Sequence, residues 1–261
     1  MLVATNAEKL AAVEASLRAI NPNVQVLSVA ANIADAQSVA DLFAKVKTNF
    51  GHADILVNSA GVNAGGGAIH DEDPDKWWQN FVCPSLHTLS LPSQGRETTN
   101  PILTRPQEVN TKAPFLLAQH FIRALPSPTT TRATIVNLVT ASAWLVYPFM
   151  SGYSISKLAA LQLMAHLAAA YPNVTAVGLH PGLVETDMLL DAFKRFDLDS
   201  PALIGGLAVW LAASEKARFL TGRVVVSEWS VDDLVERKGE IEEGGLLQMD
   251  LRGTFGREQF E

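Results

Sequence analysis

Thr134-Ile135-Val136-Asn137-Leu138-Val139 is a short run of mostly apolar and β-branched residues, typical of a strand that is covered on both faces. An Ala/Leu-rich stretch over residues 153–171 follows it and has the length of a helix, and a second apolar run occupies residues 174–179. A helix between two such strands is the crossover that joins parallel strands. This region therefore predicts a parallel sheet with helices packed on it.

The same alternation continues on both sides of this region. Asp35 precedes apolar residues at helical spacing, from Val39 to Phe50, and Gly51 ends that predicted helix. The other predicted elements are strands at residues 24–29, 53–57 and 223–226, and helices at residues 113–125 and 201–213. We therefore expect an α/β fold, a doubly wound parallel sheet, in a single domain over residues 1–261.

The N-terminal region is unusual for such a fold. Residues 8–20 have the spacing of an amphipathic helix, but only residues 1–5 remain for the strand that should lead into it. We therefore expect the N-terminal β-α unit of the fold to be missing. Without it, strand edges and apolar faces would be open on either side of its place.

Residues 82–107 interrupt the pattern and are expected to form an irregular insertion. They have little periodicity and contain the single cysteine, Cys83, and four prolines, at positions 84, 92, 101 and 106. Two origins stay open. The segment is either a functional insertion that covers the site or a translated intron, because Val82-Cys83 and Gln107 are compatible with the codons GTATGT and CAG.

The last part of the chain, from about residue 229 to 261, is expected to be a C-terminal tail. Its charged stretch over residues 236–243 is typical of a solvated face. Its apolar residues are candidates for packing against a partner subunit, and they are Trp229, Leu234, Ile241, Leu246 and Leu247.

Composition narrows the classes of partner. The chain has 20 Lys and Arg against 27 Asp and Glu, a net charge of −7 with no basic cluster, which disfavours nucleic acid and anionic membranes. No apolar run approaches the ~18 residues that a membrane span needs. A single cysteine and the lack of a signal-peptide pattern indicate a cytoplasmic protein. The six histidines lack the spacings of metal ligands, so no metal is expected.

The pair Tyr153 and Lys157 carries the main chemical signal. Residues four apart on a helix project from the same face. A lysine cation beside a phenol favours the phenolate and lowers its pKa, which would give a proton donor and acceptor for a carbonyl/alcohol pair. Thr140 and Ser142 follow a predicted strand, so their hydroxyls are expected at the crevice where open α/β sheets bind ligands. By itself, the Tyr/Lys spacing also occurs by chance in surface helices.

Several motifs in order resemble the short-chain dehydrogenase/reductase family. Asn58-Ser59-Ala60-Gly61 looks like its Asn-Asn-Ala-Gly segment, and Asn110 looks like its catalytic-helix asparagine. Tyr153-Ser154-Ile155-Ser156-Lys157 fits its Tyr-x-x-x-Lys signature, and the segment His180 to Thr186 resembles its Pro-Gly-x-Val-x-Thr segment. The resemblance implies a Rossmann-like, NAD(P)-binding domain.

By this resemblance, Tyr153 is the general acid and base, and Lys157 lowers its pKa while bonding the nicotinamide ribose. Asn110 positions water in a proton relay. Thr140 takes the place of the substrate-orienting serine, with Ser142 as the reserve. Asn32 stands where the family has an aspartate that bonds adenine. The residues expected to contact the cofactor are Asn32, Ile33, Asn58, Ala60, Gly61, Tyr153, Lys157, Pro181, Gly182, Val184 and Thr186.

The implied activity is hydride transfer between nicotinamide and a small alcohol or ketone, in an assembly that would be a dimer or tetramer. The cofactor is NADP or NAD, with a slight preference for NADP, because the segment Val3-Ala4-Thr5-Asn6 carries no acidic residue.

The residues before residue 8 are too few to contain the family's phosphate loop. Gly61, Gly65 and Gly67 match its spacing, but an acidic, proline-containing stretch follows them. The alternatives are a non-catalytic remnant that lacks this loop, and an epimerase-type relative.

Overall fold

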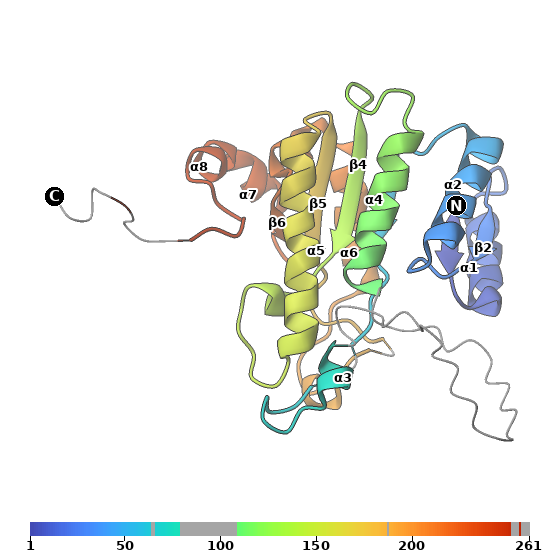
Figure 1. Cartoon of the computed structure of the whole chain (residues 1–261). Helices are drawn as coiled ribbons and strands as arrows, with labels where there is room; N and C mark the ends of the chain where they lie inside the picture. Colours follow the sequence, from blue (N-terminus) through green and yellow to red (C-terminus); the bar gives the residue numbers. More distant parts are fainter. Residues whose placement is uncertain (64–65, 79–108, 187, 252–255, 257–261) are drawn as a thin grey trace, which may run out of the picture.

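The computed structural model describes residues 1–63, 66–78, 109–186, 188–251 and 256. Its elements follow one another as an α/β alternation (Figure 1). The strands are β1 (Leu2–Ala4), β2 (Ser28–Ala30), β3 (Ile55–Asn58), β4 (Ala133–Leu138), β5 (Val174–His180) and β6 (Val224–Val226). The α-helices are α1 (Ala7–Ile20), α2 (Ala36–Phe50), α3 (Pro74–Trp78), α4 (Lys112–Ala124), α5 (Ser151–Ala170), α6 (Pro201–Ala213), α7 (Val231–Glu236) and α8 (Lys238–Glu243), and the short 3₁₀ helices are η2 (Ala141–Ala143), η3 (Asp191–Phe193) and η4 (Glu215–Leu220).

All strand pairs among the described residues are parallel, and they form two separate sheets. One sheet contains β1 and β2, and the other has the order β3-β4-β5-β6. The register pairs Asn58 with Asn137 and Leu138 with Leu179. The carboxyl ends of β3, β4 and β5 therefore lie next to one another at the same edge of the larger sheet.

Helices cover both faces of the larger sheet, with α4 and α5 in front of β4 and β5 and α6 behind them (Figure 1). Successive strand residues point to opposite faces. Ile135 packs with Phe121 of α4 and Met164 of α5 in one apolar cluster, which also contains residues of α2. Its neighbour Val136 packs with Leu207 of α6 in a second cluster on the other face. The sheet is thus the middle layer of three, as predicted for a doubly wound fold.

Local sequence signals explain most of the element boundaries. The carboxylate of Asp35 accepts a hydrogen bond of 2.7 Å from the backbone N–H of Ser38 and caps α2. Gly51 ends that helix with φ +79, a conformation that glycine adopts without steric cost. The strand predicted at residues 24–29 is found later, at Ser28–Ala30, where it pairs among the described residues with the three-residue strand β1.

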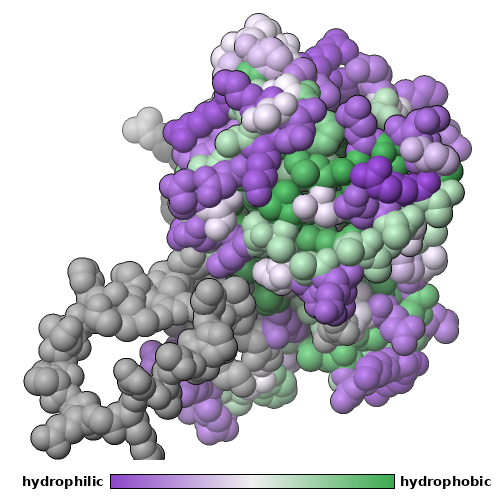
Figure 2. Space-filling view, turned by 90° about the vertical axis from the view of Figure 1, so that its right-hand side faces the viewer, coloured by the Kyte–Doolittle hydropathy of each residue, from purple (hydrophilic) through white to green (hydrophobic). Residues whose placement is uncertain are grey.

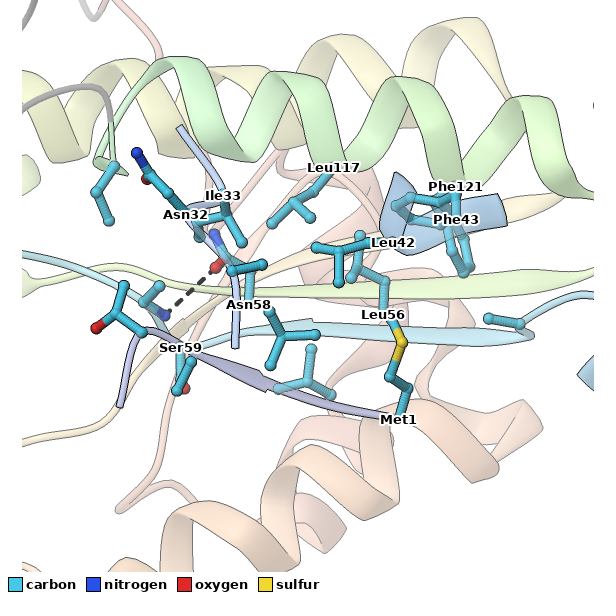
Figure 3. A pocket seen from close by; sticks show the side chains of 18 of the residues that line it. Met1, Asn32, Ile33, Leu42, Phe43, Leu56, Asn58, Ser59, Leu117 and Phe121 are labelled. Carbon is cyan, nitrogen blue, oxygen red and sulfur yellow. Dashed lines mark hydrogen bonds between the residues drawn. The ribbon is translucent and has the colours of Figure 1, made fainter. Parts of the chain in front are cut away.

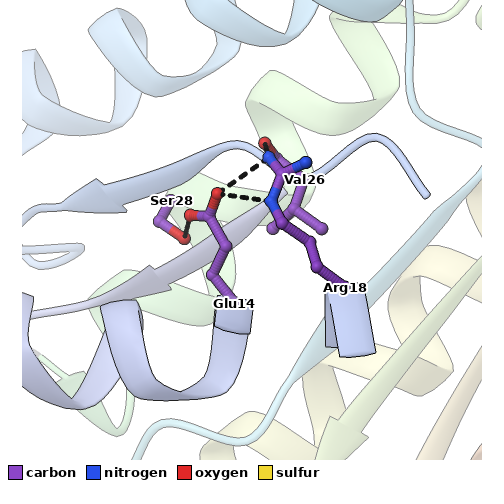
Figure 4. Close-up of polar contacts among 4 residues, drawn as sticks. All are labelled: Glu14, Arg18, Val26 and Ser28. Carbon is purple, nitrogen blue, oxygen red and sulfur yellow. Dashed lines mark hydrogen bonds and ion pairs between the residues drawn. The ribbon is translucent and has the colours of Figure 1, made fainter. Parts of the chain in front are cut away.

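Polar contacts hold α1 against β2. Glu14 of α1 accepts a hydrogen bond of 2.6 Å from the hydroxyl of Ser28 and pairs with Arg18 at 2.8 Å (Figure 4). Arg18 also donates to the carbonyl of Val26 at 3.3 Å. The first helix and the two short strands therefore form a connected N-terminal unit.

The C-terminal tail differs from its expectation. Over residues 231–243 it forms α7 and α8, and Leu234 and Ile241 are buried in the same cluster as Leu207 of α6. These two side chains pack against their own domain rather than on a partner subunit. The helices that carry them lie on the β6 side of the larger sheet, at the left in Figure 1. The predicted insertion at residues 82–107 lies outside the described residues. Among the helices that are described, none combines the length and apolarity needed to cross a bilayer.

Candidate active site

The predicted site residues that follow β3, β4 and β5 meet at the carboxyl edge of the larger sheet. Buried Asn58 ends β3 and donates a hydrogen bond of 2.7 Å to the side-chain oxygen of Asn137 in β4. The oxygen of Asn58 accepts a bond of 3.3 Å from the N–H of Ala60. This pair fixes the turn that leads into Gly61, so the loop after β3 has a defined course over the sheet edge.

Lys157 is buried at this edge, with only 5% of its surface exposed. Its Nζ donates a hydrogen bond of 3.0 Å to the carbonyl of Leu138, the last residue of β4. A Cβ atom added to Gly61 would lie 3.0 Å from this Nζ. The absence of a side chain at Gly61 therefore provides space for the amine. Burial lowers the pKa of Lys157 to about 8, since the apolar surroundings disfavour the ammonium form.

Asn110 lies between the loop after β3 and helix α5, and it is almost completely buried. Its side-chain oxygen accepts a bond of 3.0 Å from the N–H of Val62, and its amide donates to the carbonyl of Val62 at 2.8 Å. The same amide donates to the hydroxyl of Ser156 at 3.1 Å. Asn110 thereby connects the loop that carries Gly61 to the helix that carries Lys157.

Tyr153 lies in the first turn of α5, one turn before Lys157. Burial raises its pKa to about 12, which is the opposite of the direction expected from the Tyr/Lys spacing. The physical reason is desolvation, because burial disfavours the charged phenolate, while the amine of Lys157 donates its hydrogen bond to the Leu138 carbonyl. The backbone oxygen of Tyr153 accepts a bond of 2.7 Å from Ser156, which joins its turn to Asn110.

Thr140 and Ser142 lie directly after β4, where the sequence predicts the substrate-orienting hydroxyl. Thr140 is the N-cap of η2, and its hydroxyl oxygen accepts bonds of 3.4 Å from both the N–H and the hydroxyl of Ser142. The two hydroxyls therefore neighbour each other at the end of the strand that also holds Lys157.

The segment from His180 to Thr186 follows β5. Gly182 has φ +72, and a Cβ atom at this position would collide with a carboxylate oxygen of Asp199. Asp199 accepts a bond of 2.9 Å from the N–H of Leu183, which fixes the turn beside Pro181. Val184 is half-buried and Thr186 is exposed, and the hydroxyl of Thr186 accepts a bond of 3.3 Å from the N–H of Met188.

His180, at the end of β5, stands beside this turn. Its ring meets Trp144 edge to face, with centroids 5.6 Å apart. Burial lowers its pKa, and the charge of Asp199 partly opposes this shift. Within the described part of the chain, its buried Nδ1 has no hydrogen-bond partner.

A cavity of about 470 Å³ opens between the N-terminal unit and β3 (Figure 3). Asn32 and Ile33, which follow β2, line it together with Asn58 and Gly61. The side-chain oxygen of Asn32 accepts a bond of 3.1 Å from the N–H of Ala34. The structure thus brings the predicted adenine-side residues and the loop after β3 to one cavity.

The glycines that match a phosphate loop by spacing do not lead into a long helix. Gly65 is outside the described residues, and a turn at Ala68 to Glu72 follows Gly67 before the five-residue helix α3. No group of three or more His, Cys, Asp or Glu side chains is arranged to hold a metal ion within the residues that the structure describes.

Residues 1–195 match the family model described as short chain dehydrogenase. The chain belongs to this family. A short chain dehydrogenase of Monascus ruber, citE, is 33% identical over 251 residues, which are 94% of this chain and 76% of the relative. The short chain dehydrogenase andI of Emericella variicolor is 31% identical with the same coverage. The predicted family and its oxidoreductase class are therefore confirmed.

Solved structures share the fold of this short-chain dehydrogenase. A short chain dehydrogenase from Salmonella enterica serovar Typhi superposes with a TM-score of 0.69 at 21% identity, over 87% of this chain and 84% of the other. A blue fluorescent protein from a metagenomic library, solved in complex with NADPH, gives 0.66 at 20% identity, over 86% and 83%. These likenesses confirm the predicted α/β, Rossmann-like fold class.

Three residues that organise this edge of the dehydrogenase were not predicted from the sequence. Asn137 holds Asn58, Ser156 joins Asn110 to α5, and Asp199 holds the turn after Gly182. Asn137 had a signal in the sequence, because it is the one amide within a mostly apolar strand. Ser156 and Asp199 act through contacts with residues far away in the sequence, which no local pattern shows.

Proposed function

We propose that this dehydrogenase transfers hydride between a nicotinamide dinucleotide and a small alcohol or ketone, with Tyr153 as the general acid and base. The placement of Lys157 carries the proposal. Its buried amine lies at the carboxyl edge, between the Leu138 carbonyl and Gly61, one helical turn after Tyr153. A phenol and an amine on the same helix face form an arrangement suited to proton exchange with a carbonyl oxygen.

The residues at this edge fit the two ends of a dinucleotide. The amine of Lys157 and the loop from Asn58 to Gly61 offer polar groups to a ribose, and Asn32 offers an amide to an adenine edge. Pro181, Gly182, Val184 and Thr186 would contact the nicotinamide side, with Ile33 beside the adenine. For the pyrophosphate, the described residues contain no glycine turn that opens a long helix.

The chain's own groups would handle the proton. The phenol of Tyr153 would give its proton to the substrate oxygen in reduction and take it back in oxidation. The hydroxyls of Thr140 and Ser142 would hold that oxygen, since they lie together at the end of β4. Asn110 would hold the loop after β3 and helix α5 together through its bonds to Val62 and Ser156. It would also position a water molecule in the proton relay. A bound nicotinamide would supply or accept the hydride on carbon.

NADP is the preferred cofactor in this proposal, with NAD as the other choice. The segment Val3 to Asn6, which ends β1, carries no acidic side chain that would repel a 2′-phosphate. Three fold neighbours were solved with NADPH or NADP. The substrate would be a small-molecule alcohol or carbonyl compound, and the assembly a dimer or tetramer.

The test is turnover of NADPH and NADH with a panel of small ketones, followed by the absorbance of the reduced nicotinamide. Tyr153→Phe should lower turnover by at least about 100-fold while cofactor affinity changes little, because only the proton donor is removed. Tyr171→Phe is the matched control, since Tyr171 stands at the other end of the same helix. Equal turnover of Tyr153→Phe and the native chain would refute the role of the phenol.

A second candidate is a non-catalytic remnant that keeps the site residues but does not bind the dinucleotide. The raised pKa of Tyr153 and the lack of a described phosphate-binding turn favour it. Titration with NADPH and NADH, read by tryptophan fluorescence, separates the two candidates. Saturable binding supports the enzyme, and no binding of either nucleotide at millimolar concentration supports the remnant.

A further inference from the structure

Trp144 lies beside the proposed substrate site and takes no part in the proposed proton transfer. It is the C-cap of η2, two residues after Ser142, whose hydroxyl donates to that of Thr140 at 3.4 Å. The backbone N–H of Trp144 donates to the carbonyl of Ala141 at 3.1 Å. The indole therefore leaves the same short turn as the two hydroxyls that would hold the substrate oxygen.

The indole of Trp144 is half-buried. Its buried part packs on an apolar cluster of Val139, Ala143, Leu161 and Val224. This cluster lies below the carboxyl edge of the sheet, since Val224 begins β6 and Leu161 is one turn farther along α5 than Lys157. The open part of the indole therefore faces outward at that edge.

His180 holds the indole from the side of β5. The two rings meet edge to face, with planes at 84° and centroids 5.6 Å apart, an arrangement that aromatic rings favour. Because the buried Nδ1 finds no hydrogen-bond partner among the described residues, the imidazole acts on Trp144 through its ring. A ring that is already held in place loses less freedom when a ligand packs on it.

The chain that leads from this indole to the phenol of Tyr153 is uncharged. Residues 141–153 contain no Asp, Glu, Lys or Arg. Leu145 is 50% exposed and Val146 is 96% exposed. The end of this loop has a fixed position, because the indole N–H of Trp77 donates to the hydroxyl of Ser151 at 2.8 Å. The loop therefore offers an apolar surface beside the reacting groups.

Exposed hydrophobic residues by themselves do not identify a ligand site. They also gather in the middle of the face that carries the N-terminal unit (Figure 2). The segment of Trp144 differs because it begins at the hydroxyl of Thr140 and ends at the phenol of Tyr153. A carbonyl oxygen held between these two groups would leave the rest of the substrate beside the indole.

We propose that Trp144 is a specificity-determining residue that selects aryl ketones and aryl-substituted secondary alcohols, with His180 as the positioning residue that holds the indole. A flat aromatic ring gains more from contact with an indole than an aliphatic group of the same size does. The inference rests on the proposed hydride transfer and names its substrate class. The hydride and proton transfers themselves are unchanged.

The test compares acetophenone with cyclohexyl methyl ketone, which has the same number of carbon atoms but a ring that is not flat. The ratio of their kcat/KM values with NADPH is measured in each variant, so the intrinsic reactivity of the two ketones cancels between variants. Trp144→Leu should lower the ratio at least about threefold, whereas Trp144→Phe should keep it within about twofold. An unchanged ratio in Trp144→Leu would overturn the proposal.

The role of His180 is tested by the same ratio. His180→Leu should lower it, and His180→Phe should restore it, because phenylalanine keeps a ring for the edge-to-face contact. Trp210→Leu is the control, since Trp210 packs in the cluster under α6 and its loss should affect Tm but not the ratio. A native ratio in His180→Leu would overturn the positioning role, because a purely structural loss lowers both kcat/KM values alike.

A binding measurement separates this inference from the proposed activity. The chain has five tryptophans, and the indole N–H signal that is missing from the NMR spectrum of Trp144→Phe belongs to Trp144. Acetophenone should shift this signal saturably and more than cyclohexyl methyl ketone does. A selective shift without turnover would refute the hydride transfer but support the aryl preference. Equal shifts with both ketones, or none, would overturn the preference even if turnover is observed.

Discussion

The side-chain Nζ of Lys157 lies 3.0 Å from the carbonyl oxygen of Leu138 and is buried there. This contact ties helix α5 to the end of β4, and it places an amine with a lowered pKa at the edge where the substrate would bind. Burial of this amine makes the stability of the fold depend on pH in a direction that can be calculated.

The free energy of unfolding should rise with pH between about 8 and 10.5. Over this range Lys157 is deprotonated in the folded chain but still protonated in the unfolded one. Because the unfolded state binds more protons, its free energy rises relative to that of the folded state as pH rises. Chemical denaturation of the native chain and Lys157→Met at pH 7, 8, 9 and 9.5 isolates this effect. The unfolding free energy of the native chain minus that of Lys157→Met should increase with rising pH. A difference that does not change with pH would contradict the lowered pKa.

The spectroscopic titration of tyrosine should show one phenol that ionises late. The chain has three tyrosines, and burial raises the pKa of Tyr153 to about 12. Ultraviolet difference spectra of the native chain and Tyr153→Phe should therefore agree below pH 11 and separate above it, within the range where the chain stays folded. A Tyr153 contribution that appears near pH 10 would show that the phenol is less desolvated than the structure indicates.

Much of the fold could be predicted because its signals are local. The buried strand of residues 134–139, the cap at Asp35 and the stop at Gly51 act within one element, and the structure has them within one or two residues. The packing of Leu234 and Ile241 could not be predicted, since it depends on where the tail returns in space.

The sequence predicts which elements carry the candidate site residues better than it predicts the pKa values of those residues. The Tyr153 and Lys157 spacing placed both residues on one helix, but the direction of the phenol's pKa depends on where the amine points and how much water reaches it. Asn110 was predicted as a site residue, whereas its bonds to Val62 and Ser156 depend on chain segments about 50 positions away.

Removal of the Asn110 side chain should destabilise the fold by about 2–3 kcal/mol, because its loss leaves buried groups of Val62 and Ser156 unpaired. Ser156→Ala removes only one of these contacts to Asn110 and should cost about 1 kcal/mol. A double-mutant cycle with Asn110→Ala and Ser156→Ala, measured by urea unfolding, should give a coupling energy of at least about 0.5 kcal/mol. Strict additivity would mean that the bond between them contributes nothing to stability.

Gly61→Ala should lower activity more than stability. The new Cβ atom would stand 3.0 Å from Nζ of Lys157, so the amine must yield by a few tenths of an ångström, whereas the 3.5 Å to the side-chain oxygen of Asn110 is an ordinary contact. We expect turnover to fall by about tenfold, as a shift of about 1 Å in a positioned group can cost more than this. Gly205→Ala is the control, because its Cβ atom meets nothing within 4 Å in helix α6 and alanine favours a helix. Equal turnover of Gly61→Ala and the native chain would show that the site tolerates the displacement.

Asp199→Asn should change the pKa of His180 and leave the turn after β5 in place. The charge of Asp199 raises the pKa of His180 against the larger effect of burial, so its neutralisation should lower that pKa further. The amide keeps an oxygen for the N–H of Leu183, and its size still fits beside Gly182, so the backbone should stay in place. NMR titration of the histidine ring protons measures the shift, and Asp197→Asn controls for net charge nearby. An unchanged His180 titration in Asp199→Asn would mean that this carboxylate and the ring do not interact.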